Sequence, residues 1–269
     1  MLHVTLGLNA ATIRQADLIT GLCAAKEAGF VGYEPWVSDF HTLSKDQRVT
    51  IKRLCNYLSL KWLPLMGIQN FFVDNANVIR KSELVFSLAA EMEIPVVTVV
   101  PGQFDQSDKF AIDEATKELH KLLDKAKMFG IELFFEMVAF HKRPFNNLKK
   151  AIALAERAEI KLVIDTFHLA VSRATPEEIA KLSPELIGLV HLSDAVVKEQ
   201  IEELADEDRV LPGEGNLKLV EILRALRKTN YQGAVSVEVF HPKYADKDAY
   251  TVAKEAYKKA KEVLEAAGW

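Results

Sequence analysis

Four ionisable side chains close four consecutive apolar segments in the second half of the chain. They are three carboxylates and one imidazole: Glu136, Asp165, His191 and Glu238. If these segments are parallel strands, their carboxyl ends share one edge, and the four side chains meet there. Unpaired charges that are buried together are costly, and a divalent cation removes that cost. Three oxygen donors and one nitrogen donor suit Mn²⁺, Mg²⁺, Co²⁺ or Zn²⁺, so the pattern predicts a metal site.

Further polar residues follow two of these segments. His168 comes three positions after Asp165, and it is expected either to orient a substrate or ligand or to bond to backbone at a helix start. Asp194 follows His191 at the same distance, and it is expected either to accept an imidazole N–H or to cap a helix. Residues 212–215, Pro-Gly-Glu-Gly, predict a rigid turn folded over the same edge.

The elements that must position these side chains are short apolar segments that alternate with amphipathic ones along the whole chain. Such alternation is typical of repeated βα units around a parallel sheet. Eight units in about 250 residues predict a closed (β/α)8 TIM barrel. A doubly wound open sheet is the alternative, but no GxGxxG loop follows the first strand. The eight predicted strands are residues 3–8, 31–34, 62–66, 96–100, 131–136, 161–165, 187–191 and 234–239.

Apolar spacing and end signals predict helices between and after these strands. Residues 112–129 carry an apolar stripe that stops at Gly130, which is typical of a helix end. Residues 246–267 carry another stripe and predict a final helix. Ser44 and Thr175 each stand three positions before Gln or Glu, which indicates capping boxes.

Composition limits the classes of protein. The 269 residues carry 34 Lys and Arg against 38 Asp and Glu, and a net charge of −4 argues against a nucleic-acid partner. Cys23 and Cys55 are expected to be buried free thiols in a reducing compartment. No leader pattern and no long apolar run is present, so a cytoplasmic protein without a membrane partner is expected. We expect one domain over residues 1–269, and a homo-oligomer stays open.

Several segments resemble the xylose isomerase-like (β/α)8 superfamily of sugar isomerases and epimerases, in matching order and over most of the chain. The segments are Phe135-Glu136, Ile164-Asp165-Thr166-Phe167-His168, Val190-His191-Leu192-Ser193-Asp194, Pro212-Gly213-Glu214-Gly215, Val237-Glu238-Val239 and, for the second strand, Gly29-Phe30-Val31-Gly32-Tyr33-Glu34.

The resemblance assigns roles to individual residues. It implies that the four strand-end residues hold one divalent ion, which we expect to be Mn²⁺, with Mg²⁺, Co²⁺ or Zn²⁺ as alternatives. It makes Glu136 and Glu238 the acid/base pair as well. It also implies that His168, Arg209 and Glu34 contact a small sugar or polyol substrate.

The chemistry implied is proton transfer next to a ketone. An ion on the carbonyl and neighbouring hydroxyl of a ketose stabilises an enediolate, and the return of the proton gives epimerisation or aldose–ketose isomerisation. Inosose dehydratase-like loss of water is an alternative, as is a non-catalytic sugar-binding barrel. An apurinic endonuclease-like hydrolase is disfavoured, because Met66-Gly67 and Pro101-Gly102 supply no His at the ends of strands three and four.

The chain departs from the ketose 3-epimerases in one segment. Residues 137–143, Met-Val-Ala-Phe-His-Lys-Arg, stand where those enzymes have a motif like Glu-Pro-Leu-Asn-Arg. His141 and Lys142 are therefore candidate specificity residues, with exposed loop positions as the alternative. Trp36 and residues 71–72 are expected to wall the pocket, to form a subunit contact or to pack in the core.

Overall fold

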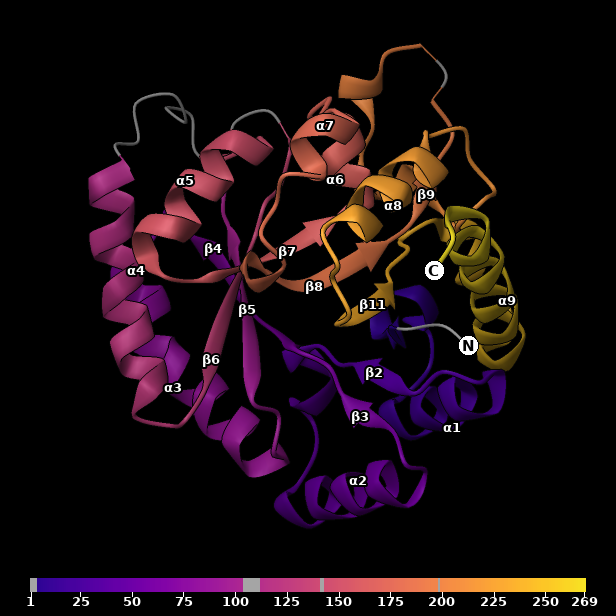
Figure 1. Ribbon diagram of the computed structural model, residues 1–269. Coiled ribbons are helices and arrows are strands. Elements are labelled where there is room, and N and C mark those ends of the chain that lie inside the picture. Colours follow the sequence, from indigo (N-terminus) through magenta and orange to yellow (C-terminus); the bar gives the residue numbers. More distant parts are fainter. Residues whose placement is uncertain (1–3, 104–111, 141–142, 198) are drawn as a thin grey trace.

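Parallel strands form the wall of a barrel, and helices cover its outside (Figure 1). This computed structural model describes residues 4–103, 112–140, 143–197 and 199–269. The strands of the wall follow one another in the order β3-β2-β1-β11-β8-β7-β6-β5-β4. The predicted (β/α)8 barrel is thereby confirmed. The strands are β1 (Thr5–Asn9), β2 (Gly32–Glu34), β3 (Lys61–Trp62), β4 (Leu65–Phe71), β5 (Val96–Pro101), β6 (Glu132–Glu136), β7 (Lys161–Asp165), β8 (Ile187–Leu192) and β11 (Ala234–Val237).

The third predicted strand is two strands in the structure. β3 pairs with β2 and β4 pairs with β5, and a single bridge from Trp36 to Met66 links the two sides. Pro64 stands between β3 and β4 and has no amide proton for a ladder. The preceding residue, Leu63, packs against Gly7. Its side chain occupies the space that a side chain at position 7 would need, because a Cβ on Gly7 would lie 2.2 Å from the Leu63 Cδ1 atom. The packing of Leu63 thus coincides with the break between β3 and β4.

The helices on the outside agree with the predicted pattern. The predicted helix over 112–129 is α4, and Gly130 behind it has a φ of 70°, which glycine adopts without strain. The capping boxes at Ser44 and Thr175 are both formed. None of the described helices is long and apolar enough to cross a membrane. The helices are α1 (Leu18–Ala28), α2 (Lys45–Tyr57), α3 (Asn75–Met92), α4 (Ile112–Lys127), α5 (Leu148–Ala158), α6 (Thr166–Val171), α7 (Pro176–Ile179), α8 (Leu219–Lys228) and α9 (Ala249–Ala267).

The two predicted thiols differ in exposure. Both cysteines are free; Cys55 in α2 is buried, whereas Cys23 in α1 is only half-buried. Burial raises the pKa of Cys55 to about 12, which makes this thiol unreactive. The expectation of two buried thiols is therefore wrong for Cys23.

Strand alternation decides which side chains enter the barrel. Phe134, Val163 and Leu189 pack together as one apolar cluster, while their neighbours along β6, β7 and β8 join the larger core that includes the helices. Because successive side chains point to opposite faces, the residue two positions further along each strand points into the barrel too. These residues are Glu136, Asp165 and His191.

The first helix offers a test of the local end signals. The Asp17 carboxylate accepts the Thr20 N–H at 2.8 Å, and this hydrogen bond lowers the pKa of Asp17. Asp17→Ala is expected to lower the free energy of unfolding by about 1 kcal/mol at pH 7, measured by urea denaturation. Because the folded-state pKa is the lower one, the difference should shrink as pH falls through it. Asp17→Ser is the matched control and should retain most of the stability; equal stability of the Ala variant and the native chain would contradict this role.

Candidate metal centre

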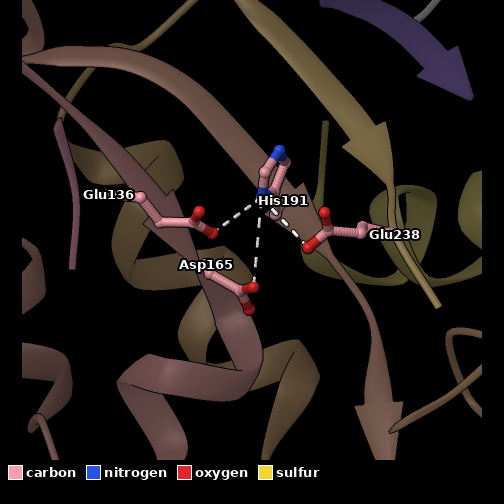
Figure 2. Close-up of side chains that lie close together, drawn as sticks. All are labelled: Glu136, Asp165, His191 and Glu238. Atoms are coloured by element: carbon pink, nitrogen blue, oxygen red, sulfur yellow. Dashed lines mark hydrogen bonds and ion pairs between the residues drawn. The ribbon is translucent and has the colours of Figure 1, made fainter. Parts of the chain in front are cut away.

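Glu136, Asp165, His191 and Glu238 converge at the carboxyl ends of neighbouring strands (Figure 2). Glu136 ends β6, Asp165 ends β7, His191 lies in β8, and Glu238 directly follows β11. One ligand atom from each residue lies within 4.8 Å of the other three, and all four residues are buried. The strand-end pattern in the sequence therefore corresponds to one compact cluster.

The cluster is arranged around one nitrogen of His191. Its Nδ1 atom lies 3.2 Å from Glu136 Oε1, 3.2 Å from Glu238 Oε2 and 4.0 Å from Asp165 Oδ2. Figure 2 shows the two glutamates reaching the imidazole from opposite sides, with Asp165 between them. Three carboxylate oxygens and one imidazole nitrogen form a donor set that suits a divalent ion of the Mg, Mn, Co or Zn kind.

The charges of the cluster are not balanced by protein groups alone. Burial raises the pKa of Glu136 to about 7, against the lowering effect of its hydrogen bond with His191. Burial also disfavours ionised Asp165, but Arg209 beside it brings the pKa of this carboxyl below its usual value. Burial alone would lower the pKa of His191, whereas Glu238 and Glu34 raise it well above the usual value. A divalent cation would supply the missing positive charge, so these residues fit one.

Arg209 reaches the cluster through a short antiparallel ribbon that the sequence did not indicate. The ribbon pairs β9 (Asp194–Ala195) with β10 (Arg209–Val210) and returns the chain to the barrel after residues 199–208, which are rich in Asp and Glu. The Arg209 side chain is 2% exposed, and its Nη1 atom lies 2.5 Å from Asp165 Oδ2. Its Nε atom lies 3.0 Å from Asp206 Oδ1 and its Nη1 atom 3.6 Å from Glu238 Oε2, so the buried guanidinium has three carboxylate partners.

His168 lies beside this guanidinium. Its Nε2 atom is 3.1 Å from Arg209 Nη2, which can only donate, so the imidazole proton belongs on Nδ1. Burial lowers the pKa of His168 to about 3 and keeps the ring neutral. The buried Nδ1 atom has no hydrogen-bond partner in the described part of the chain. His168 thus has one buried N–H group that no described residue accepts.

A cavity of about 90 Å³ opens onto these groups. Glu136, Glu238, His168 and Arg209 line it, and Trp36 lies in its wall. The aromatic residues 71 and 72, by contrast, are buried in the main core, so the core alternative holds for them. The apolar part of the cavity wall consists of Trp36, Met66, Val100, Val138, Phe140 and Phe240.

Asp194 has neither of the roles expected for it. Its carboxylate anchors the turn at 212–215 and the residues around it, and this turn is not part of the cavity lining. The expectation of an imidazole acceptor is therefore wrong. The carboxylate accepts backbone N–H groups, at 2.8 to 3.1 Å, from Ala195, Gly213, Gly215 and Leu217.

Glu34, and not Asp194, makes the contact with the His191 imidazole that was expected of Asp194. Its Oε1 atom lies 2.9 Å from His191 Nε2, on the far side of the ring from the cluster. Glu34 is fully buried and is not among the residues that line the cavity. The resemblance implied a substrate contact, whereas the geometry places Glu34 behind a candidate ligand.

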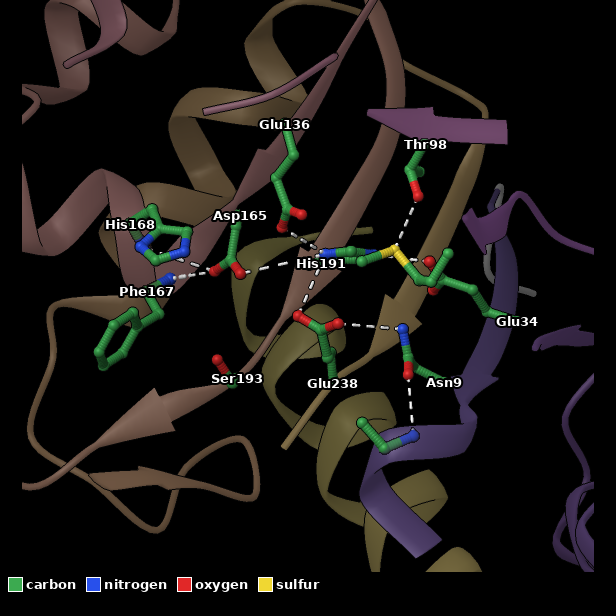
Figure 3. A network of polar contacts seen from close by, with 12 residues as sticks. Asn9, Glu34, Thr98, Glu136, Asp165, Phe167, His168, His191, Ser193 and Glu238 are labelled. Atoms are coloured by element: carbon green, nitrogen blue, oxygen red, sulfur yellow. Dashed lines mark hydrogen bonds and ion pairs between the residues drawn. The ribbon is translucent and has the colours of Figure 1, made fainter. Parts of the chain in front are cut away.

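Asn9 is a site residue to which sequence reasoning assigned no role. Its Nδ2 donates to Glu238 Oε1 at 3.1 Å (Figure 3). Its Oδ1 accepts the Trp36 Nε1–H at 2.8 Å. Asn9 thus connects the cavity wall to one of the two glutamates. Its place at the end of the first strand was the available signal. His141 and Lys142 lie outside the described residues.

The fold and the site together define the class of protein: a (β/α)8 barrel with a buried cluster of carboxylates and one histidine at the carboxyl ends of its strands. Comparison with known proteins identifies the family. The chain belongs to the xylose isomerase-like TIM barrel family, whose model matches residues 22–267. The resemblance found in the sequence is thereby confirmed.

Individual relatives match parts of the chain. An inosose isomerase of Halalkalibacterium halodurans is 30% identical over 192 residues, 69% of this chain and 66% of its own length. A 3-dehydroshikimate dehydratase of Pseudomonas aeruginosa is 26% identical over 232 residues, 81% of this chain and 35% of its own. A D-psicose 3-epimerase of Enterocloster bolteae is 26% identical over 130 residues, 47% of this chain and 39% of its own. The chain thus spans less than two thirds of the length of these relatives.

A solved structure shows the same fold over nearly the whole chain. It is that of the IolI protein with a bound zinc atom, with a TM-score of 0.88 and 24% sequence identity. The superposition covers 97% of this chain and 98% of that one.

Proposed function

We propose that the protein is a divalent-metal-dependent isomerase or epimerase that acts on a ketose or on a related polyol ketone such as an inosose. The observation that carries this proposal is the position of Glu136 and Glu238 on opposite sides of one buried cluster with Asp165 and His191. The relatives named inosose isomerase and D-psicose 3-epimerase support the same class of reaction.

The two glutamates transfer the proton. When bound by Glu136, Asp165, His191 and Glu238, a divalent ion supplies Lewis-acid polarisation of the substrate oxygens. One glutamate removes the proton from the carbon next to the ketone and leaves an enediolate, and the other glutamate returns a proton. Return on the opposite face inverts the carbon, whereas return to the adjacent carbon moves the carbonyl.

Arg209 and His168 bind the substrate oxygens in this proposal. Both side chains line the cavity, and His168 Nδ1–H is a donor without a protein partner among the described groups. The Arg209 guanidinium lies 4.4 Å from the centroid of the Phe167 ring, which holds the group in place from its apolar side. We propose Mn²⁺ as the native ion, with Zn²⁺ as the alternative that the IolI structure suggests.

Loss of water is a second candidate reaction. The similarity to a 3-dehydroshikimate dehydratase covers 81% of this chain and favours it. The same proton removal gives an enediolate, from which a β-hydroxyl leaves with a proton from the second glutamate. The C–O bond breaks and a C=C bond forms, so water is the only co-product.

Proton exchange from D₂O tests the proposed reaction and separates its alternatives. The protein with Mn²⁺ is incubated with a panel of ketoses, inososes and 3-dehydroshikimate, and the products are followed by NMR and ultraviolet absorbance. We expect deuterium at the carbon next to the ketone of at least one compound. An inverted centre indicates epimerisation, a moved carbonyl indicates isomerisation, and a new conjugated enone indicates dehydration. A metal-loaded protein without exchange on any compound would support a binding barrel.

Metal binding is expected to stabilise the fold. A divalent ion at 100 times its Kd should raise the free energy of unfolding by about 2.7 kcal/mol, because the folded cluster binds it and the unfolded chain does not. Thermal unfolding of EDTA-treated protein with Mn²⁺, Co²⁺, Zn²⁺ or Mg²⁺ measures this shift. His191→Ala removes the nitrogen donor and should abolish most of the shift, while His120→Ala, on α4, should retain it. No shift with any of these ions would contradict the metal site.

A further inference from the structure

His191 has carboxylates on both of its ring nitrogens, and the two sides differ. Its Nδ1 atom faces the cluster, 3.2 Å from Glu136 Oε1 and 3.2 Å from Glu238 Oε2. Its Nε2 atom faces Glu34 Oε1 alone, at 2.9 Å. Figure 3 shows Glu34 beyond the ring, on the side away from Asp165. A neutral imidazole carries one proton, so only one of these nitrogens is free to bind a cation.

We propose that Glu34 is a positioning residue that makes His191 a metal ligand through Nδ1. Its carboxylate accepts the Nε2–H proton, which leaves the Nδ1 lone pair toward the cluster and fixes the plane of the ring. The inference rests on the proposed metal-dependent function and deepens it. It also replaces the substrate contact that the resemblance implied for Glu34.

Among the described residues, His191 is the one side-chain partner of the Glu34 carboxylate. Glu34 is 0% exposed, and its Oε2 atom has no hydrogen-bond partner in the ranges that the structure describes. It forms no ion pair with a described Lys or Arg side chain, and the hydrogen bond to His191 is its compensation. A buried carboxylate with one partner costs stability, so its presence indicates a function of that contact.

The barrel itself directs Glu34 to this position. Glu34 is the last residue of β2 and lies opposite Asn9, the last residue of β1, in the strand register. Asn9 donates to Glu238 at 3.1 Å, and Glu34 contacts His191. The two neighbouring strand ends therefore each hold one residue of the cluster from the same side of the barrel.

Glu34→Gln tests the role, because glutamine keeps the shape but removes the charge. The amide of Gln can present N–H toward Nε2 and so stabilise the wrong tautomer, with the proton on Nδ1. We expect the Kd for Zn²⁺ to rise by about 10- to 100-fold, which is typical for loss of such an outer-shell partner. KM at saturating metal should change little, because Glu34 does not line the cavity.

Asp39→Asn is the matched control. Asp39 lies in a short 3-10 helix (Val37–Phe40) after β2, the strand that ends in Glu34, and its Oδ2 accepts the Trp36 backbone N–H at 2.8 Å without contact to His191. This variant loses a partly buried carboxylate as well, but its Kd for Zn²⁺ should equal that of the native chain.

Three measurements on the full chain test the inference. Competition with a fluorescent chelator gives the Kd for Zn²⁺ without substrate, and far-UV circular dichroism of the EDTA-treated variants shows that they are folded. NMR of the zinc-loaded protein should show a protected, downfield Nε2–H proton that is absent in His191→Ala and shifted upfield in Glu34→Gln.

An unchanged Kd together with an increased KM in Glu34→Gln would overturn the inference and return Glu34 to a substrate contact. An unchanged Nε2–H resonance would overturn it too. Because the Kd is measured without substrate, weaker metal binding in the variant supports the inference even if the native protein exchanges no proton with any ketone tested. The absence of proton exchange in the native protein would count against the proposed function and not against the role of Glu34.

Discussion

Glu238→Gln is expected to lower kcat by about 10²- to 10⁴-fold at saturating Mn²⁺, the usual contribution of a general acid or base. Glutamine keeps the size of the side chain and an oxygen that accepts from Asn9, which donates to Glu238 at 3.1 Å. It cannot take up or release the proton of the substrate carbon. Steady-state kinetics with a substrate identified by the exchange screen measures the loss, and the metal Kd is measured in parallel.

Proton exchange in the paired variants distinguishes the two glutamates. With Glu136 and Glu238 on opposite sides of the cluster, each should exchange the proton of one epimer. Glu238→Gln should lose exchange with one epimer and Glu136→Gln with the other. Glu132→Gln is the matched control. Glu132 begins β6, the strand that ends in Glu136, but it pairs with Lys161 at 3.0 Å and lies away from the site. Unchanged exchange in Glu238→Gln with both epimers would exclude its acid/base role.

Arg209→Met is expected to lower the free energy of unfolding by about 3–5 kcal/mol in the presence of EDTA, as removal of one partner from a buried ion pair does. Arg209 lies 2.5 Å from Asp165 and 3.6 Å from Glu238, and its loss leaves these two buried carboxylates without this counter-charge. Saturating Mn²⁺ should reduce the difference, because the ion would neutralise Asp165. Urea denaturation with EDTA and with Mn²⁺ measures both values.

The pH dependence and a surface variant provide controls for this result. Arg209 helps to bring the pKa of Asp165 below its usual value, so this stabilisation is complete above the unfolded-state pKa and is lost as pH falls through the folded one. The difference in free energy of unfolding between Arg209→Met and the native chain should therefore become smaller at acidic pH. Arg173→Met removes an exposed guanidinium that pairs with Glu202, and it should leave the free energy of unfolding nearly unchanged. Equal stability of Arg209→Met and the native chain in EDTA would contradict the prediction.

The barrel and the four-residue cluster could be predicted because both depend on local patterns. An apolar segment that ends in a carboxylate or imidazole places that side chain at the carboxyl edge of a parallel sheet. Glu136, Asp165, His191 and Glu238 all follow this rule, and closure of the barrel brings them within 4.8 Å. The interruption of the strand predicted over 62–66 was missed, although Pro64 is a local signal for it, and no local pattern indicated that Leu63 fills the space beside Gly7.

The sequence by itself determined which strand ends carry ionisable groups; the tertiary structure alone decided which of these groups touch. Glu34 and His191 are 157 positions apart, and Asp194, only three positions from His191, binds backbone amides instead. Arg209 reaches Asp165 only because β9 and β10 pair and return the chain to the barrel. The physical reason is that hydrogen-bond partners are chosen by distance and direction across the closed barrel, whereas sequence spacing reports only the face and end of each element.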